Sequence, residues 1–279
     1  MSGTETDSVV SRLSVMLTGI DRLAIAYSGG VDSALLLELA ARALGRDRVL
    51  AVLGISPSLP EHERTAAHDV ARHIGVPVIE VTTREGDRPD YRRNGPDRCF
   101  HCKDELFTRI TDEVMSEYRL DAVAYGENAD DIRRPDRPGA RAATAHRVLR
   151  PLADLGLGKA DVRRLAAACG LPCADKPAAP CLASRIPHFT EVTPARLAQV
   201  ERAEAGLRAL GFTDLRVRHH GEVARIELCP DDLVRAVGEP MREAVHVAVI
   251  GAGFRFAALD VAGIQSGAFT LPLVQAARV

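Results

Sequence analysis

The chain has 279 residues, of which 46% are apolar, and its net charge is -2, so its length and apolar content allow one sizeable core and a smaller second domain. The near-neutral charge excludes a broad basic face for a nucleic-acid backbone, and we expect no nucleic-acid partner. No apolar run reaches the ~18 residues of a membrane span and the polar start of the chain is unlike a signal peptide, so we expect a cytoplasmic protein with no membrane partner.

The predicted elements of the first half alternate between buried strands and helices. We expect strands at 23–27, 49–55, 76–81 and 122–125, and helices after residue 32, around 61–73 and from about 102 to 118. This alternation predicts an α/β fold, a parallel sheet with helices on both faces. Because ligands bind at the carboxyl ends of parallel strands, the loops that begin at Ser28, Ser56, Thr82 and Gly126 should open onto one crevice.

The segment SGGVDS, residues 28–33, follows the first predicted strand and opens a helix. Gly29 and Gly30 let the backbone approach an anion, and the helix directs its positive end at it. These features predict a polyphosphate site made by Ser28, Gly29, Gly30, Asp32 and Ser33. It is not a Walker A loop, because no lysine follows the second glycine. The segment resembles the SGGxDS loop of the PP-loop ATP pyrophosphatase superfamily, which implies cleavage of ATP between the α and β phosphates and adenylation of an acceptor.

The later part of the chain contains polar loops and a second region of different character. The composition of residues 84–98 favours a mobile loop over the crevice, or alternatively a solvated surface loop. The composition of residues 131–143 favours a second loop. A short strand then leads to a helix that begins near residue 159, and a proline-rich connector follows.

Beyond the connector the regular alternation ends. We expect a helix over 194–210, strands over 215–220 and 223–228, a helix near 231–237, and strands over 246–253 and 254–262. These elements predict a small α+β domain. The predicted division is therefore a PP-loop domain, 1–187, and a substrate-binding or oligomerisation domain, 188–279.

Six cysteines in a reducing compartment indicate reactive or metal-binding thiols rather than disulfides. Cys99 and Cys102 form a C-x-x-C pattern at or just before a helix start, where helix amides lower the pKa of a thiol. Together with Cys181 they can hold a [4Fe-4S] cluster and leave one iron without a protein ligand. A closed zinc site, completed by His101 or a fourth cysteine, is the alternative. The other three are expected to be small apolar fillers or inert thiols: Cys169, Cys173 and Cys229.

Six motifs, SGGVDS, RCFHCKDELF, YGENADD, DKPAAPCLASRIP, RVRHHGEVARIEL and ALDVAGIQSG, closely resemble those of the LarE family. The resemblance implies an ATP-dependent sulfur transferase that converts the carboxylates of a pyridinium-3,5-dicarboxylate mononucleotide into thiocarboxylates, for the nickel-pincer nucleotide cofactor of lactate racemase. One variant of the family gives up the sulfur of a single cysteine at the position of Cys181. The other binds a [4Fe-4S] cluster on three cysteines, and the presence of Cys99 and Cys102 indicates this variant.

The resemblance also implies roles for individual residues. Cys181, Asp32 and Lys103 are expected to be catalytic, with Mg²⁺ held partly by Asp32. Ser56 is expected beside the adenine and ribose of ATP, and Gly126 close to the nucleotide. Lysines 103, 159 and 176 would offset the phosphate charge. The substrate's phosphate or carboxylate would contact Ser184, Arg185, Arg218 and Arg225, for which a solvated sheet face is the alternative.

Three other functions fit parts of the sequence. A tRNA-thiolating PP-loop enzyme should bring a basic RNA-binding module, of which the charge gives little sign. An amide-forming synthetase would need an ammonia source, and no glutaminase segment is visible. An adenine-nucleotide sensor without chemistry would not need Ser28, Asp32 and Ser33 together. We therefore expect an enzyme that acts on a small-molecule nucleotide and forms a homo-oligomer, as the family does.

Overall fold

The computed structural model describes residues 2–132, 139–265 and 269. These residues form two compact units: unit 1 lies within 1–85 and 99–179, and unit 2 within 86–98 and 180–279. The structure thus divides the chain at 179/180 rather than at 187, and it assigns a segment from the first half of the sequence to unit 2. No helix in the described part of the chain is both long enough and apolar enough to cross a membrane.

Unit 1 contains a four-stranded sheet that confirms the predicted fold class. Its strands are β1 (Leu23–Tyr27), β2 (Val49–Ile55), β3 (Val78–Thr82) and β4 (Ala122–Tyr125), in the order β3-β2-β1-β4. Every neighbouring pair is parallel. The carboxyl ends of the four strands therefore lie at one edge, as the alternation of elements predicted.

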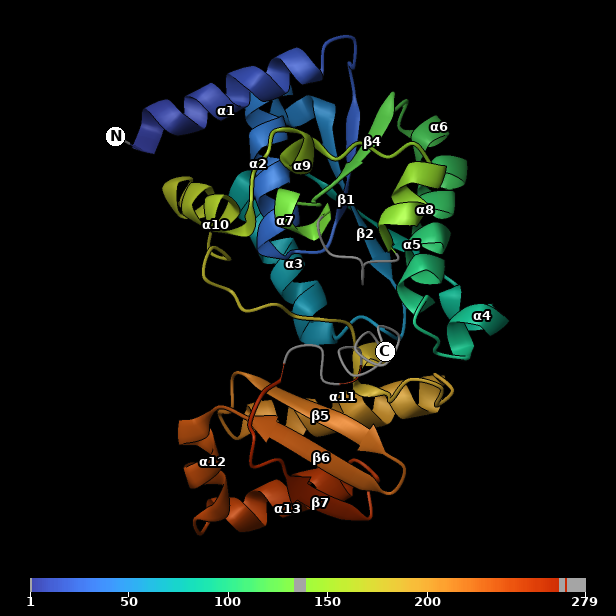
Figure 1. The fold of residues 1–279 in the computed structure, drawn as a ribbon, viewed down its shortest axis with the longest axis vertical. Coiled ribbons are helices and arrows are strands. Elements are labelled where there is room, and N and C mark those ends of the chain that lie inside the picture. The colour runs from blue at the N-terminus through green and yellow to red at the C-terminus, as the bar shows by residue number, and fades with distance from the viewer. Residues whose placement is uncertain (1, 133–138, 266–268, 270–279) are drawn as a thin grey trace, which may run out of the picture. The chain divides into compact units, whose positions relative to one another are not determined.

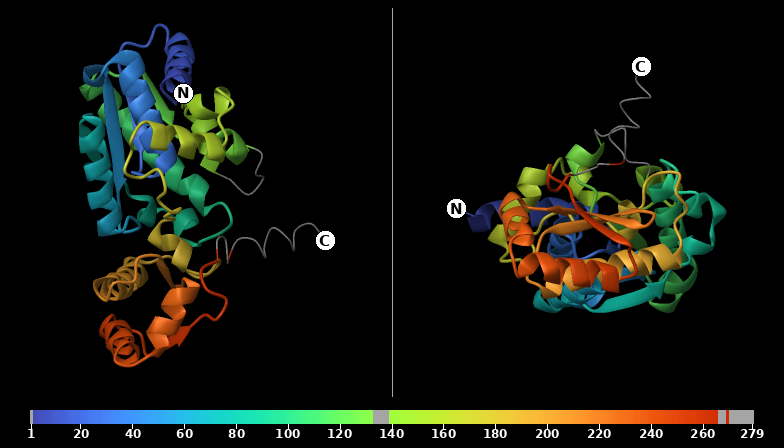
Figure 2. Two further views of the ribbon diagram at one scale, coloured as in Figure 1. Left: turned by 90° about the vertical axis from the view of Figure 1, so that its left-hand side faces the viewer. Right: turned by 90° about the horizontal axis from the view of Figure 1, so that it is seen from below.

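Helices cover both faces of this sheet (Figures 1 and 2). One face carries α1 (Ser2–Met16), α2 (Val31–Leu44), α3 (Glu61–Ile74), α9 (Pro151–Asp154) and α10 (Lys159–Ala168). The opposite face carries α5 (Arg98–Arg109), a π-helical turn (Ile110–Val114), α6 (Met115–Glu117) and α8 (Gly139–Ala145), and α7 (Ala129–Ile132) follows β4. The predicted short strand near residue 149 is a single bridge from Leu149 to Ala124.

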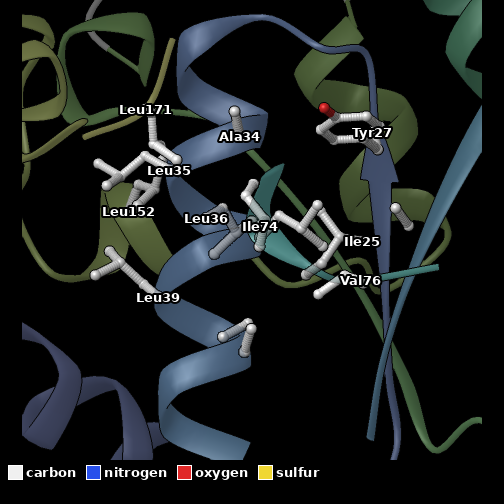
Figure 3. Close-up of a cluster of buried hydrophobic side chains, with 14 of the residues drawn as sticks. Ile25, Tyr27, Ala34, Leu35, Leu36, Leu39, Ile74, Val76, Leu152 and Leu171 are labelled. Atoms are coloured by element: carbon white, nitrogen blue, oxygen red, sulfur yellow. The ribbon is translucent and has the colours of Figure 1, made fainter. Parts of the chain in front are cut away.

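The helix α2 lies between two apolar layers and is buried nearly all round (Figure 3). Leu36 points toward Ile25 of β1, whereas Leu35 and Leu39 point away from the sheet toward Leu152. Each buried leucine contributes roughly 1.5–3 kcal/mol relative to exposure. This burial fixes the start of α2, and with it the loop that precedes the helix.

Unit 2 contains a three-stranded mixed sheet, which fits the predicted small α+β domain. Its strands are β5 (Leu215–His220), β6 (Val223–Leu228) and β7 (Phe256–Leu259), with β5 antiparallel and β7 parallel to β6. The helices are α4 (Pro89–Arg92), α11 (Pro194–Ala209), α12 (Pro230–Val237) and α13 (Met241–Gly251). α11 packs against α13 and β5.

The predicted strand over 246–253 is wrong, because most of this segment belongs to α13. Its β-branched residues favour strands, but Val245 and Val249 are buried four residues apart while Val247 is exposed. That spacing is the period of a helix. Tertiary burial of one helical face therefore overrides the local propensity.

Most of the predicted mobile loop over 84–98 is instead folded, because residues 86–98 belong to unit 2. It contains a 3-10 turn (Glu85–Asp87) and α4, and Tyr91 and Asn94 are buried. The Asn94 side-chain amide donates to three backbone carbonyls far along the chain, those of Ile186, Pro187 and Thr190. Residues 133–138 of the second predicted loop lie outside the described residues.

Candidate active site

The loop between β1 and α2 has the geometry of an anion cradle. Gly29 has a φ of 70°, and a Cβ there would lie 2.7 Å from the Cα of Ala67, so only glycine fits. The Ser33 hydroxyl donates to the Gly30 carbonyl (3.1 Å) and accepts from the Ser28 amide (3.2 Å). These bonds hold the loop in shape, and the first amides of α2 have no acceptor within the helix and remain available to a ligand.

The chain that leaves β4 passes directly against this loop. A Cβ on Gly126 would lie 2.7 Å from the Ser33 nitrogen, so glycine is required at this contact. Asn128, two residues on, donates its amide to Asp32 (2.9 Å) and to Asp131 (2.9 Å). The structure thus places Gly126 and Asn128 of the YGENADD motif against this loop, and the expected contact of Gly126 with a nucleotide stays a prediction.

Asp32 is also paired with the ammonium group of Lys159, at the start of α10. One amide donor, from Asn128, and one ammonium donor, from Lys159, thus hold the Asp32 carboxylate beside the phosphate loop. The Lys159 side chain is partly exposed, and its expected role in offsetting phosphate charge stays a prediction. Oxygen ligands beside bound phosphates are the usual environment of Mg²⁺, so Asp32 fits its predicted role.

Lys103 reaches the same end of the sheet from α5. Its ammonium group lies 4.4 Å from the centroid of the Tyr125 ring, at the end of β4. A Cβ on Gly139 of α8 would lie 2.7 Å from the Lys103 side chain, so α8 packs closely over it. Burial, and then the neighbouring Glu127, raise the pKa of Tyr125, which therefore stays neutral. The structure thus brings Lys103 and Gly126 to one strand end.

Ser56 and Lys176 are each held by a buried carboxylate that sequence reasoning missed. Ser56, just beyond β2, donates its hydroxyl to Glu85 (2.5 Å). Lys176 donates to Glu63 of α3 (2.6 Å). Neither carboxylate has a local sequence signal, because each meets its partner across a long chain separation. This ion pair ties the connector to α3, and the expected role of Lys176 beside the phosphates stays a prediction.

No disulfide joins the six cysteines, all of which lie among the described residues. Cys99 is exposed and Cys102 half-buried, both in the first turns of α5. Cys181 caps the 3-10 turn Leu182–Arg185. Accessible thiols of this kind suit the thiolate coordination of an iron–sulfur cluster. As predicted, Cys173 lies in the core and Cys169 packs against it.

The predicted metal site draws on both units, since Cys99 and Cys102 belong to unit 1 and Cys181 to unit 2. Within 2–132 and 139–265, no three His, Cys, Asp or Glu side chains form a group that would hold a metal ion. The three-cysteine site therefore stays a prediction.

The predicted substrate arginines of unit 2 form a buried ionic network around the turn that follows Cys181. Arg185 is 2% exposed and donates to Glu204 (2.9 Å) and to the Ser184 hydroxyl (2.9 Å). Arg218, 4% exposed, donates to Glu227 (2.9 Å) and to the Ser184 carbonyl (3.0 Å). A solvated sheet face is therefore wrong for these two arginines.

Arg225 lies opposite Arg218 in the strand register and pairs with Asp260 and with Glu227 (3.3 Å). Substrate contact by Ser184 and these arginines stays a prediction. Sequence reasoning missed Glu204, which occupies a buried position of α11 near Val200 and Leu207. A charged residue within such an apolar stripe was the available signal.

Comparisons with known proteins find similar chains over most of the sequence. A profile of the NAD synthase family matches residues 7–89, which contain the phosphate loop. The chain is 38% identical to an uncharacterized protein of Synechocystis sp., over 94% of the chain and 96% of that protein. It is 33% identical to the pyridinium-3,5-bisthiocarboxylic acid mononucleotide synthase of Lactiplantibacillus plantarum, over 93% of each. An uncharacterized protein of Methanocaldococcus jannaschii is 30% identical over 78% of the chain and 81% of its own length.

Proposed function

The chain belongs to the LarE family of the Lactiplantibacillus plantarum synthase, and on this premise we propose that it is an ATP-dependent sulfur transferase of nickel-pincer cofactor synthesis. Its substrate is a pyridinium-3,5-dicarboxylate mononucleotide, whose carboxylates become thiocarboxylates. The observation that carries the proposal is the phosphate loop, in which Gly29, Ser28 and Ser33 form an anion cradle at the start of the buried helix α2.

The chemistry explains why such a loop is needed. A carboxylate is a poor electrophile, so its oxygen first attacks the α-phosphorus of ATP and pyrophosphate leaves. The loop amides, Lys159 and Lys103 are the groups available to offset the charge that develops on the phosphates. A sulfur nucleophile then attacks the carbonyl carbon of the acyl adenylate, and AMP leaves with the bonding electron pair.

We also propose that Cys99, Cys102 and Cys181 hold a [4Fe-4S] cluster. When bound, the cluster would supply sulfide from the iron that has no protein ligand. One contact within unit 2 supports this assignment. The Arg98 guanidinium donates to the Ala183 carbonyl (2.8 Å), so the residue that directly precedes Cys99 is tied to the turn that begins at Cys181.

The proposed setting follows from the same features. Reduced thiols would persist in the cytoplasm, and a near-neutral charge suits a small-molecule substrate better than a nucleic acid. By analogy with the family, we propose that the protein acts as a homo-oligomer.

The test is anaerobic purification with iron and sulfide analysis, followed by incubation with ATP and the dicarboxylate nucleotide. We expect iron and sulfide in the protein, AMP and pyrophosphate as products, and an unchanged polypeptide mass after turnover. Cys181→Ala should abolish cluster binding and sulfur transfer but keep ATP binding, while Cys229→Ala, the control in unit 2, should behave like the wild type. A zinc protein that releases ADP would contradict both the cluster and the adenylation.

A further inference from the structure

Phe189 combines a strained backbone with an exposed aromatic side chain, and neither feature stabilises the fold. Its backbone adopts a φ of 64°, a left-handed conformation that is unfavourable for a residue with a Cβ. Its side chain is 70% exposed, so the ring adds little through burial. The residue is third in a turn closed by the Thr190 amide and the Pro187 carbonyl (3.0 Å), and a third residue with positive φ is usually glycine.

The surrounding structure imposes this conformation. The buried Asn94 amide donates to the carbonyls on either side of the turn, those of Pro187 (2.8 Å) and Thr190 (3.0 Å). The Phe189 amide donates back to the Asn94 carbonyl (3.1 Å). A strained residue that its neighbours hold in place is typical of functional sites. The fixed backbone therefore directs the Phe189 side chain toward solvent.

A hollow of about 460 Å³ lies beside this ring, lined by Pro89, Arg92, Arg93, Phe189 and Glu191. All five residues belong to unit 2. The volume is within the range of small-molecule sites. The lining offers one aromatic face, two guanidinium groups and one carboxylate, which suits a flat ring that bears charged substituents.

The charges of the hollow are available to a ligand. Arg92 pairs with Glu191 and Arg93 pairs with Asp90, and the Arg93 side chain is 74% exposed. Exposed ion pairs of this kind contribute little to stability, so a ligand carboxylate or phosphate can replace the protein carboxylate at small cost. The ring face attracts a cationic aromatic ring such as a pyridinium. The buried Arg185, in contrast, is already bound to Glu204.

We propose that Phe189 and Arg93 bind the aromatic nucleotide substrate, Phe189 by stacking on the pyridinium ring and Arg93 by pairing with a carboxylate or phosphate. The identity of the ligand rests on the proposed function. The site itself rests on the strained, exposed ring and on the hollow beside it.

The test uses the full chain and a direct binding measurement by calorimetry. The probe is nicotinic acid mononucleotide, a pyridinium carboxylate nucleotide, and ribose 5-phosphate is the control without a ring. Phe189→Gly relieves the backbone strain, so it should raise the unfolding temperature and weaken binding of the probe roughly tenfold, the size of a lost stacking contact. Phe189→Leu should weaken binding equally without the gain in stability.

Arg93→Gln should also weaken binding of the probe. Its matched control is Arg72→Gln, because Arg72 forms an equally exposed pair with Asp69 at the same sequence spacing in unit 1. The proposal is overturned if the wild type binds the probe no better than ribose 5-phosphate, or if Phe189→Gly binds it as the wild type does. Failure of the proposed function would instead appear as absence of AMP and thiocarboxylate in the wild type, whether or not the probe binds.

Discussion

Replacement of Glu204 by glutamine tests whether the ionic network of unit 2 supports the fold. The Glu204 carboxylate is 2% exposed and accepts from Arg185 (2.9 Å) and from the Val217 amide (3.0 Å). Glutamine has nearly the same shape but carries no charge, so the guanidinium of Arg185 would remain buried without its counter-ion. Loss of one partner of a buried pair costs roughly 3–5 kcal/mol, and we expect a loss of this size in the free energy of unfolding.

Urea unfolding followed by far-UV circular dichroism measures this loss, and hydrogen exchange of the α11 amides assigns it to unit 2. The matched control is Glu222→Gln in the same unit. Glu222 pairs with Arg255 at 3.5 Å, and both side chains are more than two-thirds exposed, so this change should cost at most about 0.5 kcal/mol. A cost below about 1 kcal/mol for Glu204→Gln would refute the reasoning. It would indicate that the other acceptors of Arg185, the Pro180 carbonyl and the Ser184 hydroxyl, are enough to stabilise its buried charge.

Two further changes probe unit 1. Gly126→Ala places a Cβ 2.7 Å from the Ser33 nitrogen, so it should destabilise the protein by roughly 1–3 kcal/mol and weaken ATP binding, measured by calorimetry. The control is Gly251→Ala, because the space around Gly251 is open. Unchanged ATP affinity in Gly126→Ala would show that the loop tolerates the shift. Burial opposes ionisation of Glu63, but hydrogen bonds from the adjacent imidazole and from Lys176 outweigh it and lower the pKa of Glu63 from 4.5 to about 2. The stability from this pair should therefore be complete above pH 4.5 and be lost as the pH falls toward 2. The urea midpoint of unfolding should change less across this pH range in Glu63→Gln than in the wild type. An equal change of the midpoint with pH in both proteins would show that the Glu63–Lys176 pair does not contribute this stability.

The parts of the fold predicted correctly are those with local signals. The segment 28–33 needs only its own glycines and hydroxyls to form the phosphate loop, and the apolar run after Asp32 predicts a buried helix. α1 was missed although Val9, Leu13 and Leu17, all buried, follow a helical spacing. Their signal is weak because Val10, Val15 and Met16 stand between them and are apolar without being buried, so the apolar stripe is blurred.

The parts that were missed depend on contacts between distant segments. Residues 86–98 are polar enough for a loop, and nothing in their own sequence shows that Asn94 meets the carbonyls of residues 186–190. Glu204 and Glu227 likewise find their arginine partners across the fold. A sequence pattern reports which face of an element is buried, but it does not report which distant group will neutralise a buried charge.

Because residues 86–98 belong to unit 2 while the segments on either side belong to unit 1, the polypeptide passes between the units three times. During synthesis, Asn94 emerges from the ribosome about ninety residues before the carbonyls that it binds, so unit 2 can be completed only after most of unit 1 has been made. A gene fragment encoding residues 180–279 alone would omit Asn94 and Arg98 and leave those carbonyls without donors. Separate production of this unit therefore requires the earlier segment to be supplied, for example as a fused peptide.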